Sequence, residues 1–106
     1  MKILIPSNDK KQIAEIFEQA NYFIFYEAGK GIVKIIEERK NPIKENFNKS
    51  EDEQIEQLYN FLCDCEIIIC KKIHPKLSTK FKSSNTLILK TLETNSKTSI
   101  INMVCR

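Results

Sequence analysis

Hydrophobic residues along the chain occur in short runs that polar or glycine-containing segments separate. Runs of branched residues at 3–5, 66–70 and 86–89 are typical of strands that are covered on both faces, as in a parallel sheet. Two further runs, at 22–26 and 32–36, flank Gly29 and Gly31 and predict a β-hairpin. Asn41-Pro42 is expected to end this hairpin, because proline cannot donate to a strand ladder.

Helical periodicity appears in the second half of the chain. Ser50 and Glu53 have the spacing of a capping box, which predicts that a helix begins there. The apolar residues that follow fall at offsets typical of one buried helix face: Ile55, Leu58, Tyr59 and Leu62. Pro75 is expected at the first position of a shorter helix, with Leu77 and Phe81 on its inner face. We also expect a turn of helix at 13–19 and a last helix that begins near Ser96.

The order of these elements restricts the topology. Three strands are followed by alternating helices and strands, so a hairpin must be joined to right-handed crossovers in a mixed sheet with helices on its faces. The 106 residues are enough to bury one core without disulfides, and neither an internal repeat nor a low-complexity linker is found. The prediction is a single α/β domain over residues 1–106.

Charge is distributed unevenly along the chain. Residues 1–26, 27–66 and 67–106 carry net charges of 0, −4 and +7. A basic C-terminal third favours an anionic partner, although a solvated lysine face explains the same bias. Without interleaved arginine or exposed aromatic residues, such lysines would contact phosphate and not bases. The lysines concerned are Lys71, Lys72, Lys76, Lys80 and Lys82.

The cysteines are expected to be reduced. The apolar start at 1–6 gives way at once to polar residues, so we expect no signal peptide, no membrane span and a cytoplasmic location. Cys63, Cys65, Cys70 and Cys105 are then free thiols or metal ligands. If 66–70 is a strand, Cys65 and Cys70 lie roughly 16 Å apart and cannot share one zinc ion. The simplest interpretation of Cys63 and Cys65 is packing as small apolar residues.

Four collinear motifs resemble the dinitrogenase iron-molybdenum cofactor biosynthesis family of nitrogenase accessory proteins. They are Met1-Lys2-Ile3-Leu4-Ile5-Pro6, Phe17-x-x-Ala20-x-Tyr22-Phe23, Asn41-Pro42 and Ile73-x-Pro75. The resemblance implies a three-layer ribonuclease-H-like fold, with a five-stranded mixed sheet of order 3-2-1-4-5 in which strand 2 is antiparallel to the rest. It also implies a protein that holds or passes on metalloclusters, with a cluster donor or acceptor protein as partner.

Two segments depart from the family pattern. In the family, the position of Phe17 lies between histidine and glycine and is followed by arginine, whereas the neighbours here are Ile16, Glu18 and Gln19. The family loop Gly-Gly-Ile-Gly-Pro is replaced by residues 71–75, Lys-Lys-Ile-His-Pro. These changes put side chains where glycine would let a backbone approach a bulky ligand.

The candidate site follows from the implied sheet order. Ligands of open α/β sheets bind outside the carboxyl ends of the strands where the strand order reverses, here between strands 1 and 4. Cys70 and His74 are the candidate metal ligands, and the candidate cofactor-binding residues are Ser7, Asn8, Lys71 and Lys72. The helix that begins at Pro75 would direct free N–H groups and a positive dipole to the same place. A plain helix cap at His74 and a buried strand end at Cys70 are the alternatives.

We expect a protein that is not an enzyme. The first strand offers no carboxylates for two-metal hydrolysis, and His74 could pair as a base only with Cys70 or Cys105, without a supporting nucleophile motif. The predicted function is a binding or carrier protein for an anionic ligand, with an iron–sulfur or iron–molybdenum type cluster as the candidate. The alternative is a non-specific nucleic-acid or phosphate-binding module that uses the basic C-terminal third. The chain is expected to be a monomer or a homodimer formed through the strand edge at 31–39.

Overall fold

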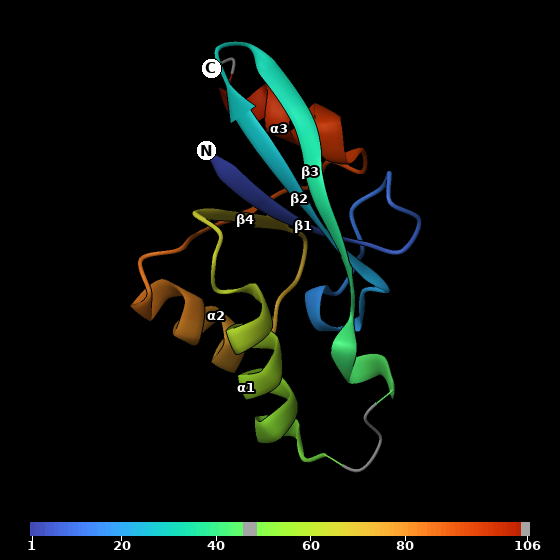
Figure 1. Cartoon of the computed structure of the whole chain (residues 1–106), viewed down its shortest axis with the longest axis vertical. Helices are drawn as coiled ribbons and strands as arrows, with labels where there is room; N and C mark the ends of the chain where they lie inside the picture. The colour runs from blue at the N-terminus through green and yellow to red at the C-terminus, as the bar shows by residue number, and fades with distance from the viewer. Residues whose placement is uncertain (46–48, 105–106) are drawn as a thin grey trace.

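The computed structural model describes residues 1–45 and 49–104, and Cys105 lies outside the described residues. Figure 1 shows one sheet with helices on both sides. The strands are β1 (Lys2–Ser7), β2 (Tyr22–Gly29), β3 (Ile32–Lys40), β4 (Ile67–Cys70) and β5 (Leu87–Lys90). The helices are α1 (Glu51–Leu62), α2 (Pro75–Ser83) and α3 (Ser96–Val104), with short 3-10 turns η1 (Phe17–Gln19) and η2 (Pro42–Glu45). No helix within these residues is long and apolar enough to cross a bilayer.

The sheet has the order β3-β2-β1-β4-β5, with β1 at its centre. β2 pairs antiparallel with both β1 and β3, whereas β4 pairs parallel with β1 and with β5. The predicted order 3-2-1-4-5 with strand 2 antiparallel is therefore confirmed. β1 and β4 run side by side in the same direction, so Ser7 and Cys70 end their strands at the same edge of the sheet.

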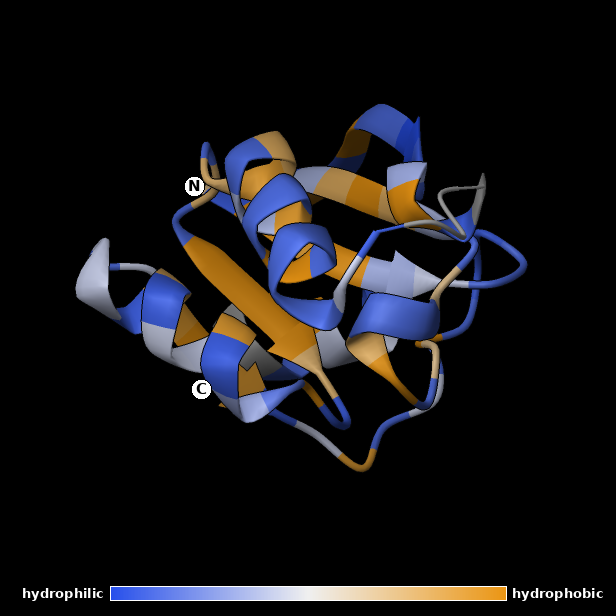
Figure 2. Cartoon of the chain, turned by 90° about the horizontal axis from the view of Figure 1, so that it is seen from below, coloured by the Kyte–Doolittle hydropathy of each residue, from blue (hydrophilic) through white to orange (hydrophobic). Residues whose placement is uncertain are grey.

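Each face of the sheet is covered by a separate hydrophobic cluster. α1 and α2 pack on one face, where the buried aromatic residues gather: Phe17, Phe23, Phe25 and Phe81. The opposite face is mostly aliphatic and lies under α3, which contributes the buried Ile100. In Figure 2 the hydrophobic colour follows the strands and the helix sides that face them. The domain therefore has three layers, as predicted.

Side-chain caps determine where α1 and α2 begin. The Ser50 hydroxyl accepts the Glu53 backbone N–H at 3.3 Å, as the capping-box spacing predicted. At α2, Nδ1 of His74 accepts the Lys76 N–H at 3.1 Å, and Pro75 takes the first helical position, where its missing N–H costs nothing. His74 is thus a helix cap, the simpler of the two roles considered for it.

The turn of helix expected at 13–19 covers only part of that range, and the prediction of a covered strand at 86–89 is wrong. Residues 13–19 form only the short turn η1, because Ile13 packs under the α3 face while Phe17 packs on the other face, and one amphipathic helix cannot reach both. β5 is an edge strand and not a covered one. Leu87 is 53% exposed, since no further strand pairs with β5 in the described sheet.

Candidate functional site

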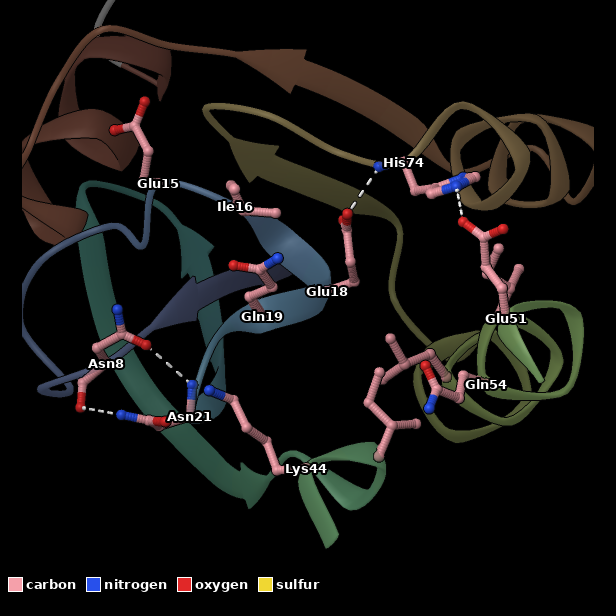
Figure 3. A pocket seen from close by; sticks show the side chains of 13 residues that line it. Asn8, Glu15, Ile16, Glu18, Gln19, Asn21, Lys44, Glu51, Gln54 and His74 are labelled. Atoms are coloured by element: carbon pink, nitrogen blue, oxygen red, sulfur yellow. Dashed lines mark hydrogen bonds and ion pairs between the residues drawn. The ribbon is translucent and has the colours of Figure 1, made fainter. Parts of the chain in front are cut away.

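A pocket of about 740 Å³ lies at the sheet edge where β1 and β4 end (Figure 3). We call it the His74 pocket. Its walls come from the segment after β1, from η1 and η2, from α1 and from the start of α2. The lining residues are Asn8, Glu15, Ile16, Glu18, Gln19, Asn21, Ile43, Lys44, Glu51, Gln54, Ile55, Leu58 and His74.

Backbone bonds attach the η1 wall to the rest of the pocket. The Phe17 N–H donates to the Lys72 carbonyl at 2.8 Å, so η1 is held against the segment between β4 and α2. The buried side chain of Asn41 donates to the carbonyls of Glu18 and Ala20 at 3.1 and 2.7 Å. Its own carbonyl oxygen accepts the Ile43 N–H at 3.1 Å, which links η1 to η2. One buried amide thus positions two walls.

Asn8 forms the part of the wall that follows β1. Its side-chain oxygen accepts the Asn21 backbone N–H at 3.0 Å, and the Asn21 amide lies 3.5 Å from the Asn8 carbonyl (Figure 3). The next residue, Asp9, folds the loop back because its carboxylate accepts the N–H groups of Lys11 and Gln12 at 2.9 and 2.8 Å. These two bonds lower the pKa of Asp9.

His74 lies between two glutamates (Figure 3). Its backbone N–H donates to the Glu18 carboxylate at 3.1 Å, and its Nε2 is 2.6 Å from the Glu51 carboxylate. Because Nδ1 already accepts the Lys76 N–H, the neutral ring carries its proton on Nε2 and donates it to Glu51. The imidazole is therefore oriented by two groups, the Glu51 carboxylate and the Lys76 N–H, while Glu18 holds the His74 backbone.

The charge around the pocket differs from the expected anion-binding surface. Three glutamates line it, against Lys44 and His74. Lys71 and Lys72, predicted to attract an anion, approach the Glu15 carboxylate with N···O distances of 3.9 and 3.5 Å. The predicted lysine stripe on α2 is largely neutralised in the same way, since Lys76 and Lys80 form ion pairs with Asp52 and Glu56 on α1.

The structure separates the predicted site residues into two groups. Asn8 and His74 line the pocket. Ser7 and Cys70 are fully buried. The Ser7 hydroxyl donates to the Gln12 carbonyl at 2.6 Å, and Cys70 belongs to the hydrophobic cluster under α1 and α2, where burial raises the pKa of its thiol to about 11. The Cys70 thiol is therefore protonated at neutral pH and faces apolar neighbours.

The other described cysteines lie at the opposite end of β4. Cys65 is buried, its thiol points at the Leu62 carbonyl at 3.3 Å, and burial raises its pKa to about 12. Cys63 is exposed at the end of α1. Within residues 1–45 and 49–104, no three His, Cys, Asp or Glu side chains are grouped so that they could hold a metal ion.

Residues 1–105 match the family described as Dinitrogenase iron-molybdenum cofactor. The chain belongs to this family. Solved structures share its fold: PH0822 (TM-score 0.73, 21% identity, 98% of this chain and 89% of that one) and a proposed dinitrogenase, mj0327, from Methanocaldococcus jannaschii (0.70, 20%, 98% and 88%). A third is the NMR structure of a proposed NifB protein from Thermotoga, TM1290 (0.64, 17%, 97% and 86%). None of the curated proteins matches the chain significantly.

The two departures from the dinitrogenase iron-molybdenum cofactor family pattern meet in space. Glu18 and Gln19 of the first segment and His74 of the second all line the same pocket. Glu18 and His74 even bond to each other across 56 residues of sequence. The chain thus carries its own set of polar side chains at this end of the sheet.

Sequence reasoning missed three residues of the site. Glu51 was interpreted only as part of a helix start, Glu18 only as a departure from a motif and Asn41 only as a strand end. The Asn-Pro pair after a strand was the one available signal, because asparagine side chains at such turns commonly bond to nearby backbone groups. The two glutamates left no comparable signal in the local sequence.

Proposed function

We propose that this protein is a non-enzymatic carrier that holds a metallocluster of the iron–sulfur or iron–molybdenum type as cargo in the His74 pocket. The observation that carries the proposal is His74 itself, whose backbone is held by Glu18 and whose imidazole is held by Glu51, in the lining of a 740 Å³ pocket in a member of the dinitrogenase iron-molybdenum cofactor family. The pocket is within the size range of small-molecule sites.

Nε2 of His74 is the most suitable ligand atom. It points to Glu51, whose side chain is 63% exposed and can turn away into solvent. Without cargo, Nδ1 accepts the Lys76 N–H, and this bond fixes the ring so that Nε2 points to Glu51. A neutral ring that binds the cargo through Nε2 carries its proton on Nδ1, so loading would shift the proton from Nε2 to Nδ1 and break the bond that Nδ1 accepts from the Lys76 N–H.

The donor set fits cargo that brings most of its own ligands. The pocket offers imidazole, carboxylate and amide groups, while the three described cysteines are buried or lie at the other end of β4. A cluster whose metal coordination positions are filled by bridging sulfides together with non-protein ligands would need few protein ligands, and few ligands give loose binding. Loose binding suits a protein that receives a cluster and passes it to a partner, which would be a cluster donor or acceptor protein.

The test is anaerobic loading of the purified protein with iron and sulfide, and separately with extracted iron–molybdenum cofactor. Bound metal is measured by elemental analysis and by the visible absorption spectrum. We expect His74→Ala to weaken loading by about tenfold or more, as for loss of a ligand or its orienting partner. Glu51→Gln keeps the size of the side chain and should leave most of the loading intact.

The cysteines give the matched controls. Cys63→Ala with Cys65→Ala alters the far end of β4 and should retain the cargo. Cys70→Ala tests the predicted metal pair of Cys70 and His74 directly: loss of cargo from a folded variant would make Cys70 a ligand. If the Cys63/Cys65 variant loses the metal while His74→Ala keeps it, the cargo binds elsewhere and the proposal fails.

A further inference from the structure

A second pocket, of about 440 Å³, lies on the α3 side of the sheet. We call it the Lys11 pocket. Its polar lining comes from four separate parts of the chain: Lys10 and Lys11 after β1, Tyr26 on β2, Glu38 on β3, and Asn95 with Lys97 at the start of α3. It shares no lining residue with the His74 pocket.

The backbone around this pocket is held by hydrogen bonds. The Ile13 N–H donates to the Thr94 carbonyl at 2.7 Å, and the Ser96 N–H donates to the Lys11 carbonyl at 3.0 Å. Asn95 caps α3, because its side-chain oxygen accepts the Thr98 N–H at 3.0 Å. Lys11 and Lys97 therefore start from two backbone segments that are bonded to each other, which brings both lysines to the same pocket.

The charge of the pocket is not balanced. Lys10 forms an ion pair with Glu38 at 3.2 Å, but among the described residues neither Lys11 nor Lys97 has an ion-pair partner. On α2, in contrast, Lys76 and Lys80 both have acidic partners. Three lysines and one glutamate leave the pocket with a net charge of +2. Positive charges held close together repel each other, and a bound anion removes this repulsion.

Tyr26 is the one hydroxyl-bearing residue in the described lining of the pocket. Tyr26 is only 1% exposed, and its phenol lies beside the side chain of Ser96. The Ser96 hydroxyl is buried and has no hydrogen-bond partner of ordinary geometry. Buried hydroxyls are normally satisfied. Tyr26 lines the pocket, so its hydroxyl can donate to an oxygen-rich ligand, while the remaining wall, Ile35, is apolar.

We propose that the Lys11 pocket binds a small phosphate-type oxyanion, held by the ammonium groups of Lys11 and Lys97. Phosphate matches the site because it carries two negative charges near neutral pH and several acceptor oxygens. This binding does not depend on the cargo of the His74 pocket, which lies against the other face of the sheet.

The experiment is titration of the ¹⁵N-labelled protein with inorganic phosphate and pyrophosphate at constant ionic strength, followed by amide chemical shifts. We expect saturable shifts at 10–13 and 95–98. Lys11→Gln with Lys97→Gln should weaken binding by about tenfold or more, because two charge-assisted hydrogen bonds are lost. Both side chains are exposed, so the variant should fold normally.

A matched control comes from the hairpin turn. Lys30 and Lys34 line another small pocket, of about 340 Å³, and Lys30→Gln with Lys34→Gln removes the same charge. Phosphate affinity should stay within about twofold of wild type in this control, since screened long-range effects are small. Shifts that do not saturate, or equal losses in both double variants, would overturn the proposal. The Lys11/Lys97 variant should still load a metallocluster as wild type does, because the two pockets share no lining residue. Loss of phosphate binding and loss of metallocluster loading can therefore be told apart.

Discussion

The two faces of the sheet differ in packing and in how their charges are arranged. Under α1 and α2, Phe17 contacts Phe23 and Phe81 at ring separations of 5.1 and 6.1 Å, and lysines on α2 meet acids on α1. Under α3 the buried side chains are mainly isoleucines, and Lys97 at the start of this helix has no ion-pair partner in the part of the chain that the structure describes. One face is closed by two helices, the other by one short helix.

The difference means that one face contributes most of the stability of the fold, while the other face carries the unpaired positive charge. The α1–α2 face satisfies most of its charges internally, so its pocket presents polar groups oriented by their neighbours. On the α3 face, Lys11 and Lys97 have no ion-pair partner within residues 1–45 and 49–104, and a single helix packs on the sheet. We therefore expect global stability to depend mainly on the first face, and α3 to open more readily than α1.

The largest expected effect is that of Phe81→Ala. Phe81 is fully buried and its ring also packs 5.4 Å from Tyr59, so truncation leaves a cavity between α1 and α2. The free energy of unfolding should fall by about 3–5 kcal/mol in urea denaturation. A loss below about 1 kcal/mol would contradict the view that this face dominates stability.

Ile100→Ala tests the opposite face. Ile100 is the fully buried residue through which α3 packs on the sheet. We expect a loss of about 2–3 kcal/mol, less than for Phe81, because a single short helix can shift to fill part of the space. Hydrogen exchange should become faster in α3 while α1 keeps its protection. Equal acceleration in both helices would mean that the two faces unfold together.

Asp64→Asn should have a smaller effect that depends on pH. Arg39 donates to both carboxylate oxygens of Asp64, at 3.1 and 2.9 Å, and Lys2 lies 2.8 Å away. These bonds hold the pKa of Asp64 well below its usual range. A lowered pKa stabilises the fold above the unfolded-state pKa of about 4, and this contribution is lost as the pH falls further.

Because Asp64 is 48% exposed, solvent screening limits the loss at neutral pH to about 1 kcal/mol. Acid titration of urea stability is the measurement. The Asp64→Asn profile should be flatter than wild type below about pH 4. Parallel profiles would show that another carboxylate is responsible.

The smallest expected effect is that of the helix caps. Ser50→Ala removes a cap bond of 3.3 Å at an exposed helix start and should cost about 0.5 kcal/mol, while Ser50→Asp should restore it. Asn95→Ala removes the bond to the Thr98 N–H at 3.0 Å and should cost somewhat more, about 1 kcal/mol. Thermal unfolding of the variants measures both. If removing the Ser50 cap costs more than removing the Asn95 cap, then α3 depends less on its cap than we expect for the single helix on its face.

Local patterns in the sequence were sufficient for most of the fold. Consecutive branched residues indicated the central strand β1 and the buried strand β4, and the spacing of Ser50 and Glu53 located the start of α1. The order of the elements, with the family resemblance, predicted the sheet order. The strands and the start of α1 depend on residues a few positions apart, so a short window of sequence contains them, whereas the sheet order required the whole order of elements and the resemblance.

The candidate site depends on contacts between residues that are far apart in the sequence, so no short stretch of sequence could reveal it. His74 meets Glu51 and Glu18 from 23 and 56 residues away, and the lysines of α2 are neutralised by acids on α1. The sequence showed a basic C-terminal third, but the packing of α2 against α1 decided which of its charges stay free. Charge and hydrogen bonding act through space, and only the folded chain determines which groups become neighbours.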